Sequence, residues 1–275
     1  MKSLKPPPRW MFMALVVAAC STRGPDVIFL PSAADVVTRM LAIVRVDSSD
    51  VVYDLGCGDG RIVIAAARDH GARGVCVEIN PSLIASSQRN ADTAGVRERV
   101  EFRQADFFET DLSSATVVAL YLSPALNQRL RPKLFRELRA GARVVSHNFD
   151  MGDWRPDTVA RVEWPSGTTS TIYAWVLPAD VAGNWELTVD LPGGVRQYQV
   201  RFTQQHQEVS GTASSNGRKV ELTGLYLGGD SLEFRLNSAN ETTAFRFRGR
   251  VSAARMAGVV HGASPGPKPW QAIRR

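Results

Sequence analysis

Cysteine is scarce in this chain, with three residues in 275. So few cysteines exclude the small secreted folds that depend on a disulfide framework. Cys57 and Cys76 both fall where buried strand ends are expected, so packing is the role predicted for them. Long apolar runs are also missing, because the stretch from Trp10 to Ala19 is too short to span a bilayer. A hydrophobic content of 44% with 22% charged residues is typical of a globular protein.

No charge of one sign dominates the central part of the sequence. The formal net charge is +6, but residues 29–179 contain 17 basic and 18 acidic side chains, so the excess lies towards the two ends. A nucleic-acid-binding protein is expected to carry a concentrated basic surface. Because that footprint is missing from the central region, we expect no nucleic-acid partner.

The first 20 residues differ in kind from the rest. Lys2, Lys5 and Arg9 precede the apolar run, which ends in small residues before Cys20. This order resembles the signal of a bacterial lipoprotein. We therefore expect a leader over residues 1–20, a linker over 21–31 and a membrane-associated bacterial protein; an uncleaved, loosely amphipathic leader is the alternative.

Residues 32–178 show the alternation of strands and helices that is typical of a parallel sheet. Ser32 and Asp35 have the spacing of a capping box, which predicts a helix beginning at Ser32. A further helix is predicted from Pro132. The last two strands are joined by a connection too short for a helical crossover, so they should be antiparallel. The expected fold class is α/β, with a Rossmann-like, mostly parallel sheet and an antiparallel last strand.

Beyond residue 178 the composition changes to short β-rich runs separated by turn signals. Seven such runs, without a convincing helix, predict an all-β barrel-like or sandwich domain over residues 179–262. The tail over residues 263–275 is rich in proline and glycine and is expected to be loose.

The most informative stretch runs from Val51 to Ala67, where an apolar strand enters a glycine-rich turn and then an alanine-rich helix. A dinucleotide site requires the spacing G-x-G-x-x-G, but this turn has Gly56, Gly58 and Gly60, with Arg61 at the position of the third dinucleotide glycine. The pattern D-x-G-x-G-x-G, followed by an acidic residue 20 positions after Gly58, resembles the class I S-adenosylmethionine (SAM) dependent methyltransferases.

This resemblance implies a role for each matching residue. Gly56, Gly58 and Gly60 would pass beneath the methionine part of SAM, and Asp54 would organise the turn and the cofactor amino group. The remaining implied contacts are those of Glu78 with the ribose hydroxyls, Asp106 with the adenine amino group, and Phe107 with the adenine ring. Two ribose hydroxyls suit the two acceptor oxygens of one carboxylate. No metal is expected.

The methyl acceptor is indicated by shorter segments. The residues around Phe29–Ser32, the glycine turn, Val77–Pro81 and Leu134–Phe149 resemble the small lysine methyltransferases of mitochondrial membrane proteins and their bacterial relatives. The sequence from Tyr121 to Pro124 lacks the Asn/Asp-Pro-Pro-Tyr signature of enzymes that methylate nucleobases or glutamine. The resemblance therefore implies a protein lysine as acceptor.

The residues expected to line the acceptor pocket are Pro31, Ser32, Tyr121, Pro124, His147 and Asn148. His147 is a candidate proton acceptor, although a lone histidine at a strand end is more often structural. Two alternatives remain at this point: a small-molecule methyltransferase, and an exported lipoprotein that uses the fold as a binding module. Because SAM is made in the cytosol, dependence on SAM favours access to the cytoplasm.

Overall fold

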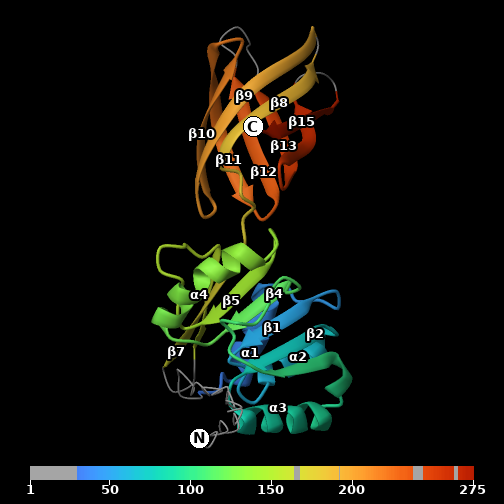
Figure 1. The fold of residues 1–275 in the computed structure, drawn as a ribbon, viewed down its shortest axis with the longest axis vertical. Coiled ribbons are helices and arrows are strands. Elements are labelled where there is room, and N and C mark those ends of the chain that lie inside the picture. The colour runs from blue at the N-terminus through green and yellow to red at the C-terminus, as the bar shows by residue number, and fades with distance from the viewer. Residues whose placement is uncertain (1–29, 164–167, 192, 238–243, 263–265) are drawn as a thin grey trace, which may run out of the picture.

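The computed structural model describes residues 30–163, 168–191, 193–237, 244–262 and 266–275. The expected leader and most of the expected linker therefore lie outside the described residues. The described chain forms an α/β part and a separate β-barrel, which are stacked along the long axis of the molecule (Figure 1). None of the described helices has both the length and the hydrophobicity needed to cross a membrane.

The α/β part contains four α-helices, one 3-10 turn and seven strands among the described residues. The helices are α1 Ala34–Ile43, α2 Arg61–His70, α3 Pro81–Thr93 and α4 Pro124–Glu137, with the 3-10 turn at Arg97–Arg99. The strands are β1 Val51–Leu55, β2 Arg73–Glu78, β3 Val100–Gln104, β4 Val117–Leu120, β5 Arg143–His147, β6 Thr158–Glu163 and β7 Thr169–Val176.

The seven strands form one sheet in the order β3-β2-β1-β4-β5-β7-β6. Strands β1 to β5 pair in parallel, whereas β7 is antiparallel to both β5 and β6. The prediction of a mostly parallel sheet with an antiparallel last strand is confirmed. Because the carboxyl ends of β1 to β5 meet at one edge, the residues that follow these strands are collected there.

Two apolar layers cover the sheet. On one face α1 and α2 pack on alternate residues of the strands, such as Val52 and Val145, and α3 packs beside α2 over Cys76. On the other face α4 packs on Leu120 and Val144 with Trp154. The alternation of buried side chains between the two faces is the period-2 pattern of a strand that is buried on both sides.

Two predicted helix boundaries are wrong. The first helix begins at Ala34, and its N-cap is Ala33, which has no polar side-chain atom to cap it. The Ser32 hydroxyl, which was predicted to cap the helix, is bonded to His147 instead. The helix expected from Pro132 begins at Pro124, where the Ser123 hydroxyl accepts from the helix amide of Leu126 at 3.4 Å. Pro132 lies inside this helix and does not start it.

The C-terminal part is a closed antiparallel barrel of eight strands. They are β8 Gly183–Leu191, β9 Gly194–Gln205, β10 Glu208–Ser215, β11 Arg218–Gly228, β12 Ser231–Asn237, β13 Phe245–Ser252, β14 Arg255–His261 and β15 Lys268–Arg274. The expectation of a barrel-like domain is confirmed. Two details are wrong: the strands number eight instead of seven, and residues 268–274 of the expected loose tail form β15, which closes the barrel by pairing with β8 and β14.

Aromatic side chains fill the barrel interior. Trp185, Tyr198, Phe234, Phe247 and Trp270 are all buried, and the rings of Phe234 and Phe247 stack with centroids 4.9 Å apart. The interior is therefore a hydrophobic core that holds the eight strands together.

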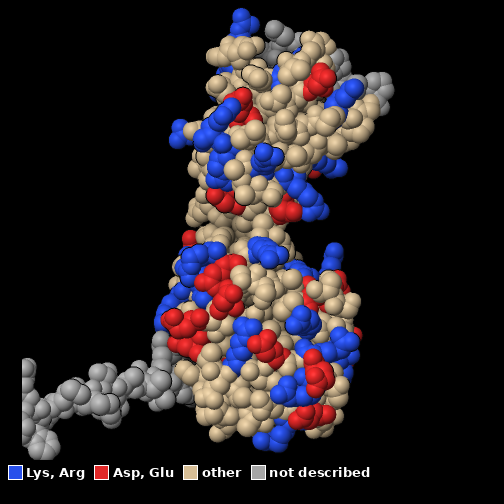
Figure 2. All heavy atoms as spheres, turned by 45° about the vertical axis from the view of Figure 1, so that its right-hand side comes forward, with Lys and Arg blue, Asp and Glu red and all other residues tan. Residues whose placement is uncertain are grey.

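The barrel joins the sheet at the edge where the parallel strands begin. Strand β7 ends at Val176, opposite the first residue of β5, Arg143. The amide of Ala179 then donates to the carbonyl of Gly229 in the barrel at 2.8 Å, and the Gln207 side chain donates to the Arg155 carbonyl at 2.7 Å. In Figure 2 the junction is a narrow waist, and acidic and basic side chains are interspersed on the visible face of both parts.

Candidate active site

The glycine turn between β1 and α2 has the backbone conformation that its sequence predicts. Gly56, Gly58 and Gly60 have φ angles of 80°, 55° and 79°, in the left-handed region that favours glycine. A Cβ atom on Gly60 would lie only 2.9 Å from the Cβ of Ser87 on α3. The amide of Gly56 donates to the carbonyl of Val77 at 2.8 Å, which fixes the turn against the end of β2.

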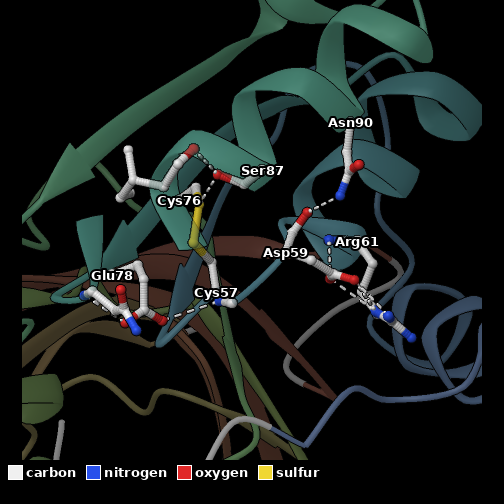
Figure 3. The surroundings of a disulfide bond; sticks show 10 residues. Cys57, Asp59, Arg61, Cys76, Glu78, Ser87 and Asn90 are labelled. Atoms are coloured by element: carbon white, nitrogen blue, oxygen red, sulfur yellow. Dashed lines mark hydrogen bonds and ion pairs between the residues drawn. A yellow bond between two sulfur atoms is a disulfide. The ribbon is translucent and has the colours of Figure 1, made fainter. Parts of the chain in front are cut away.

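Glu78 lies at the end of β2, directly beside this turn. Its buried carboxylate accepts from the amide of Gly58 at 3.1 Å through Oε2 and from the amide of Asn80 at 2.9 Å through Oε1. Figure 3 shows Glu78 close to the cysteine that follows Gly56. The carboxylate is thus held at the end of β2, directly against the glycine turn.

Asp54 is the last acidic residue before the turn and is almost fully buried. Burial, the negative charge of Glu78 and that of Asp59 together raise the pKa of the Asp54 carboxyl to about 8. Within the described residues, no ion pair with a basic side chain is found for Asp54 or Glu78. A cofactor that carries a sulfonium and an ammonium group would supply the missing positive charge, so these residues fit SAM.

Asp106 follows β3, the next strand along the same edge. Its Oδ1 atom accepts from the amide of Phe108 at 2.8 Å, and the preceding Ala105 donates its amide to the carbonyl of Glu78 at 3.1 Å. The ring of Phe107 is half-buried and lies 4.7 Å from that of Phe108. The structure therefore brings the glycine turn, Glu78, Asp106 and Phe107 to one edge of the sheet.

His147 ends β5 and is almost fully buried, with a hydroxyl group at each ring nitrogen. Nδ1 lies 2.9 Å from the Ser32 hydroxyl, and Nε2 lies 3.0 Å from the Ser170 hydroxyl. Burial lowers the pKa of the imidazole to about 4. His147 is therefore neutral at pH 7, and both of its nitrogens are occupied by protein groups, an arrangement that favours a positioning role over proton transfer.

The other acceptor-side residues surround this histidine. The Tyr121 ring lies 4.0 Å from the His147 ring and 6.2 Å from that of Phe149, which follows β5. Pro124 is exposed at the start of α4, and Pro31 is exposed next to the buried Ser32. The structure thus brings Ser32, Tyr121 and His147 into direct contact, whereas Pro31 and Pro124 flank them.

The residues predicted to hold the methyl donor, SAM, lie next to the residues predicted to hold the methyl acceptor. A Cβ atom on Gly56 would lie 3.4 Å from the Leu122 side chain, which follows Tyr121. In addition, Arg61 at the start of α2 donates to the carbonyl of Ser32 at 2.6 Å and forms an ion pair with Asp59. Asn90 on α3 completes this network by donating to the Asp59 carbonyl at 2.9 Å. The segment before α1 is therefore tied to the glycine turn.

Three features of the edge were not predicted. In the sequence, Arg61 marks only a departure from the dinucleotide pattern, and nothing signals the contact of Ser170 with His147. Cys57 and Cys76 form a disulfide, so the packing role predicted for them is wrong. The βαβ order could have indicated this disulfide, because consecutive parallel strands place the turn after β1, which contains Cys57, beside the end of β2, which contains Cys76. No cluster of potential metal ligands occurs among the described residues.

Comparisons with known proteins agree with this geometry. A family described as the ANTKMT methyltransferase domain matches residues 54–158. A protein-lysine N-methyltransferase from Saccharolobus islandicus is 44% identical over 154 residues, which cover 56% of this chain and 95% of that enzyme. An adenine nucleotide translocase lysine N-methyltransferase from Mus musculus is 35% identical over 48% of this chain, and the match spans 57% of that protein.

A solved structure is also similar. The RNA methyltransferase from Salinibacter ruber in complex with S-adenosyl-L-homocysteine is 54% identical, with a TM-score of 0.52. The match covers 55% of this chain and 96% of that one, so this protein and the archaeal enzyme are each matched over almost their whole length by little more than half of this chain. The glycine turn, Glu78, Asp106 and Phe107 form what we call the cofactor edge. Together with the geometry of this edge, these matches show that the chain is a SAM-dependent methyltransferase of the class I fold, and that it belongs to the protein-lysine N-methyltransferase family.

Proposed function

We propose that this enzyme transfers a methyl group from SAM to the side-chain amine of a protein lysine. The observation that carries the proposal is the 44% identity over 95% of the archaeal protein-lysine N-methyltransferase. The half-buried Tyr121 ring supports it, because this ring, packed on the buried neutral imidazole of His147, provides an apolar wall for the aliphatic stem of a lysine.

The residues of the cofactor edge define how SAM would be held. The glycine turn would receive its methionine part, Glu78 its ribose hydroxyls and Asp106 its adenine. When bound, SAM supplies an electrophilic methyl group on a sulfonium. The charge of Asp54 would offset the positive charge of the cofactor, which favours the carboxylate form of this residue.

The acceptor amine must arrive without its proton. Because His147 is already bonded to Ser32 and Ser170, it does not serve as the base in this mechanism. Desolvation lowers the pKa of a lysine ammonium, so entry into the site past Tyr121 favours loss of the proton to water. The protein then contributes by holding the neutral amine in line with the methyl group, an effect worth several kcal/mol in favourable cases.

The similar Salinibacter structure favours RNA as a second candidate acceptor. A direct test is to incubate the enzyme with methyl-labelled SAM and cell extract, and then to treat samples with protease or ribonuclease. Lysine methylation predicts label that protease releases and that appears as methyl-lysine after acid hydrolysis. Label released by ribonuclease would replace this proposal with RNA methylation, and label in the small-molecule fraction would replace it with small-molecule methylation.

We also propose that the N-terminal segment attaches the enzyme to a bacterial membrane. The support is the order of basic residues, apolar run and Cys20 in the sequence. A reporter enzyme fused after Cys20, read in the cytoplasm and in the periplasm, tests the compartment. Dependence on SAM predicts cytoplasmic activity of the reporter, whereas periplasmic activity would favour the exported binding-module alternative.

A further inference from the structure

Cys57 and Cys76 are joined by a disulfide at the cofactor edge (Figure 3). Cys57 lies between Gly56 and Gly58 in the turn, and Cys76 lies on β2 two residues before Glu78. The Cα atoms of the two cysteines are 5.3 Å apart, a separation that suits a disulfide. Both side chains are buried. The bond therefore links the centre of the glycine turn to the strand that presents the ribose-binding carboxylate.

The turn has few other attachments to β2. The amides of Gly56 and Cys57 donate to the Val77 carbonyl at 2.8 and 3.2 Å, and the amide of Gly58 donates to Glu78. The last of these bonds uses a carboxylate oxygen that the ribose hydroxyls would also require. When Glu78 binds a ligand, the disulfide and the two bonds to the Val77 carbonyl are the attachments that do not have to be shared, and the disulfide is the covalent one.

We propose that Cys57 and Cys76 form a reversible thiol–disulfide site, and that its oxidised form holds the glycine turn in the conformation that binds SAM. Reduction breaks the sulfur–sulfur bond and adds two electrons and two protons, which gives two thiols. The electrons and protons come from a dithiol reductant, which is itself oxidised to a disulfide. This inference deepens the proposed function by assigning a control to its cofactor site.

The physical reason lies in the three glycines of the turn. Glycine loses more conformational freedom on ordering than any other residue, so a released turn must be ordered again whenever the cofactor binds. The oxidised protein has already met this cost during folding. Coupling between two sites typically changes affinity by about 5-fold to 150-fold, and we expect the reduced enzyme to bind the cofactor about tenfold more weakly.

The same coupling must act in the other direction. The side chains of Cys57 and Cys76 are inaccessible in the closed turn, with residue exposures of 4% and 0%, so a reductant reaches the sulfur atoms only when the turn opens. A bound cofactor keeps the turn closed. We therefore expect a saturating cofactor to slow reduction of the disulfide.

The first experiment measures binding of S-adenosyl-L-homocysteine by calorimetry to the full chain in four forms. These are the protein oxidised with glutathione disulfide, the protein reduced with dithiothreitol, the oxidised Cys20→Ser variant, and the Cys57→Ser/Cys76→Ser variant. The proposal predicts equal affinity for the oxidised protein and the Cys20→Ser control. The reduced protein and the double variant should bind about tenfold more weakly. Affinities within twofold in all four forms would overturn it.

The second experiment follows reduction by dithiothreitol, with alkylation of the free thiols and mass spectrometry, in the presence and absence of S-adenosyl-L-homocysteine. Slower reduction in its presence supports the proposal, and equal rates contradict it. Circular dichroism of each form checks folding. If the reduced protein and the double variant are both unfolded, or if glutathione disulfide fails to form the bond, no reversible site exists and the proposal is wrong. Neither experiment depends on lysine being the acceptor, so failure of the proposed function is recognised separately.

Discussion

Asp54 and His147 are buried titratable residues on opposite halves of the active-site edge, and burial acts on their pKa values in opposite directions. Removal from water disfavours the charged form of each group, so the carboxyl keeps its proton to about pH 8 and the imidazole stays neutral down to about pH 4. At neutral pH both side chains are therefore uncharged in the cofactor-free protein. Each makes a different prediction about pH.

Asp54 should make cofactor binding dependent on pH. A positively charged cofactor favours the carboxylate, so below pH 8 binding must release the Asp54 proton. Affinity for SAM should then rise between pH 6 and pH 8, by at most about tenfold per pH unit. Calorimetry in buffers of different protonation enthalpy counts the released proton. In Asp54→Asn the affinity should be weaker and nearly independent of pH. An unchanged slope in this variant would assign the effect to another group.

His147 should contribute to the loss of stability in acid. Its folded-state pKa of about 4 is below the ordinary value of 6.5, so the unfolded chain binds a proton that the folded chain excludes. The resulting stability is complete above pH 6.5 and is lost as the pH falls towards 4. Urea unfolding at pH 7.5 and 5 should show a smaller difference for His147→Gln than for the unmodified protein. His70→Gln, at the end of α2, is the control and should follow the unmodified protein.

Sequence reasoning predicted a set of site residues that the structure places at one edge of the sheet, but it did not predict their contacts. The position of Glu78 and Asp106 follows from strand order, because each ends or follows a parallel strand. Ser32 illustrates the limit. Its spacing to Asp35 predicts a helix cap, yet its hydroxyl bonds to His147, a residue 115 positions away. Local spacing carries no information about a partner so distant in sequence.

At the scale of elements, the glycine turn is held by close packing against α3 as well as by its own conformation. Gly60 has a φ of 79° and faces Ser87, whereas Gly95 at the end of α3 has a φ of 68° and no atom within 4 Å of its virtual Cβ. A side chain at Gly95 would therefore meet only the unfavourable backbone conformation, whereas a side chain at Gly60 would meet that conformation and a steric clash with Ser87.

Replacement of each glycine by alanine should reveal this difference. Gly95→Ala should cost only the left-handed conformation, about 1–2 kcal/mol of unfolding free energy. Gly60→Ala adds overpacking against Ser87, typically worth a further 1–3 kcal/mol, and should weaken binding of S-adenosyl-L-homocysteine about tenfold. Denaturant unfolding and calorimetry measure the two effects. Equal stability of the variants, with equal binding, would show that the contact with α3 is unimportant.

At the same scale, the alternation of strands and helices over residues 32–178 and the mostly parallel sheet were predicted correctly, since apolar runs lie between clear turn signals. The errors occur where a local signal is ambiguous. Proline is favoured in the first turn of a helix, but two prolines occur in α4, and only Pro124 starts it. Strand β15 was missed because its composition is that of a loose tail, and its order comes from pairing with β8 and β14.

At the scale of the whole molecule, the α/β part has a complete sheet and its own apolar layers without the barrel. The match of 154 residues covers 95% of the archaeal relative but 56% of this chain, so that enzyme is much shorter than this chain. The division into two folding units was predictable from the change in composition near residue 178. The junction was not, since its contacts join loops that are far apart in sequence.

Removal of residues 179–275 should therefore leave the cofactor site intact. We expect the truncated protein to bind S-adenosyl-L-homocysteine within about twofold of the full chain, because distant sites act nearly independently. Phe135 and Leu138 line a cavity of about 360 Å³ between the two parts, together with barrel residues such as His206. Removal of the barrel exposes these two apolar side chains to water, so the melting temperature should fall. Calorimetry and a thermal scan measure both quantities. A large loss of binding in a protein that remains folded would show that the barrel supports the site.

The attachment of the barrel where the parallel strands begin has a consequence for tethering. The residues predicted to hold the cofactor and the acceptor lie at the opposite, carboxyl ends of the parallel strands, so a scaffold bound to the barrel would obstruct neither group. An enzyme held in this way can complete successive turnovers without being released. For acceptors on the same scaffold, the rate would then follow the effective concentration set by the tether instead of the bulk concentration.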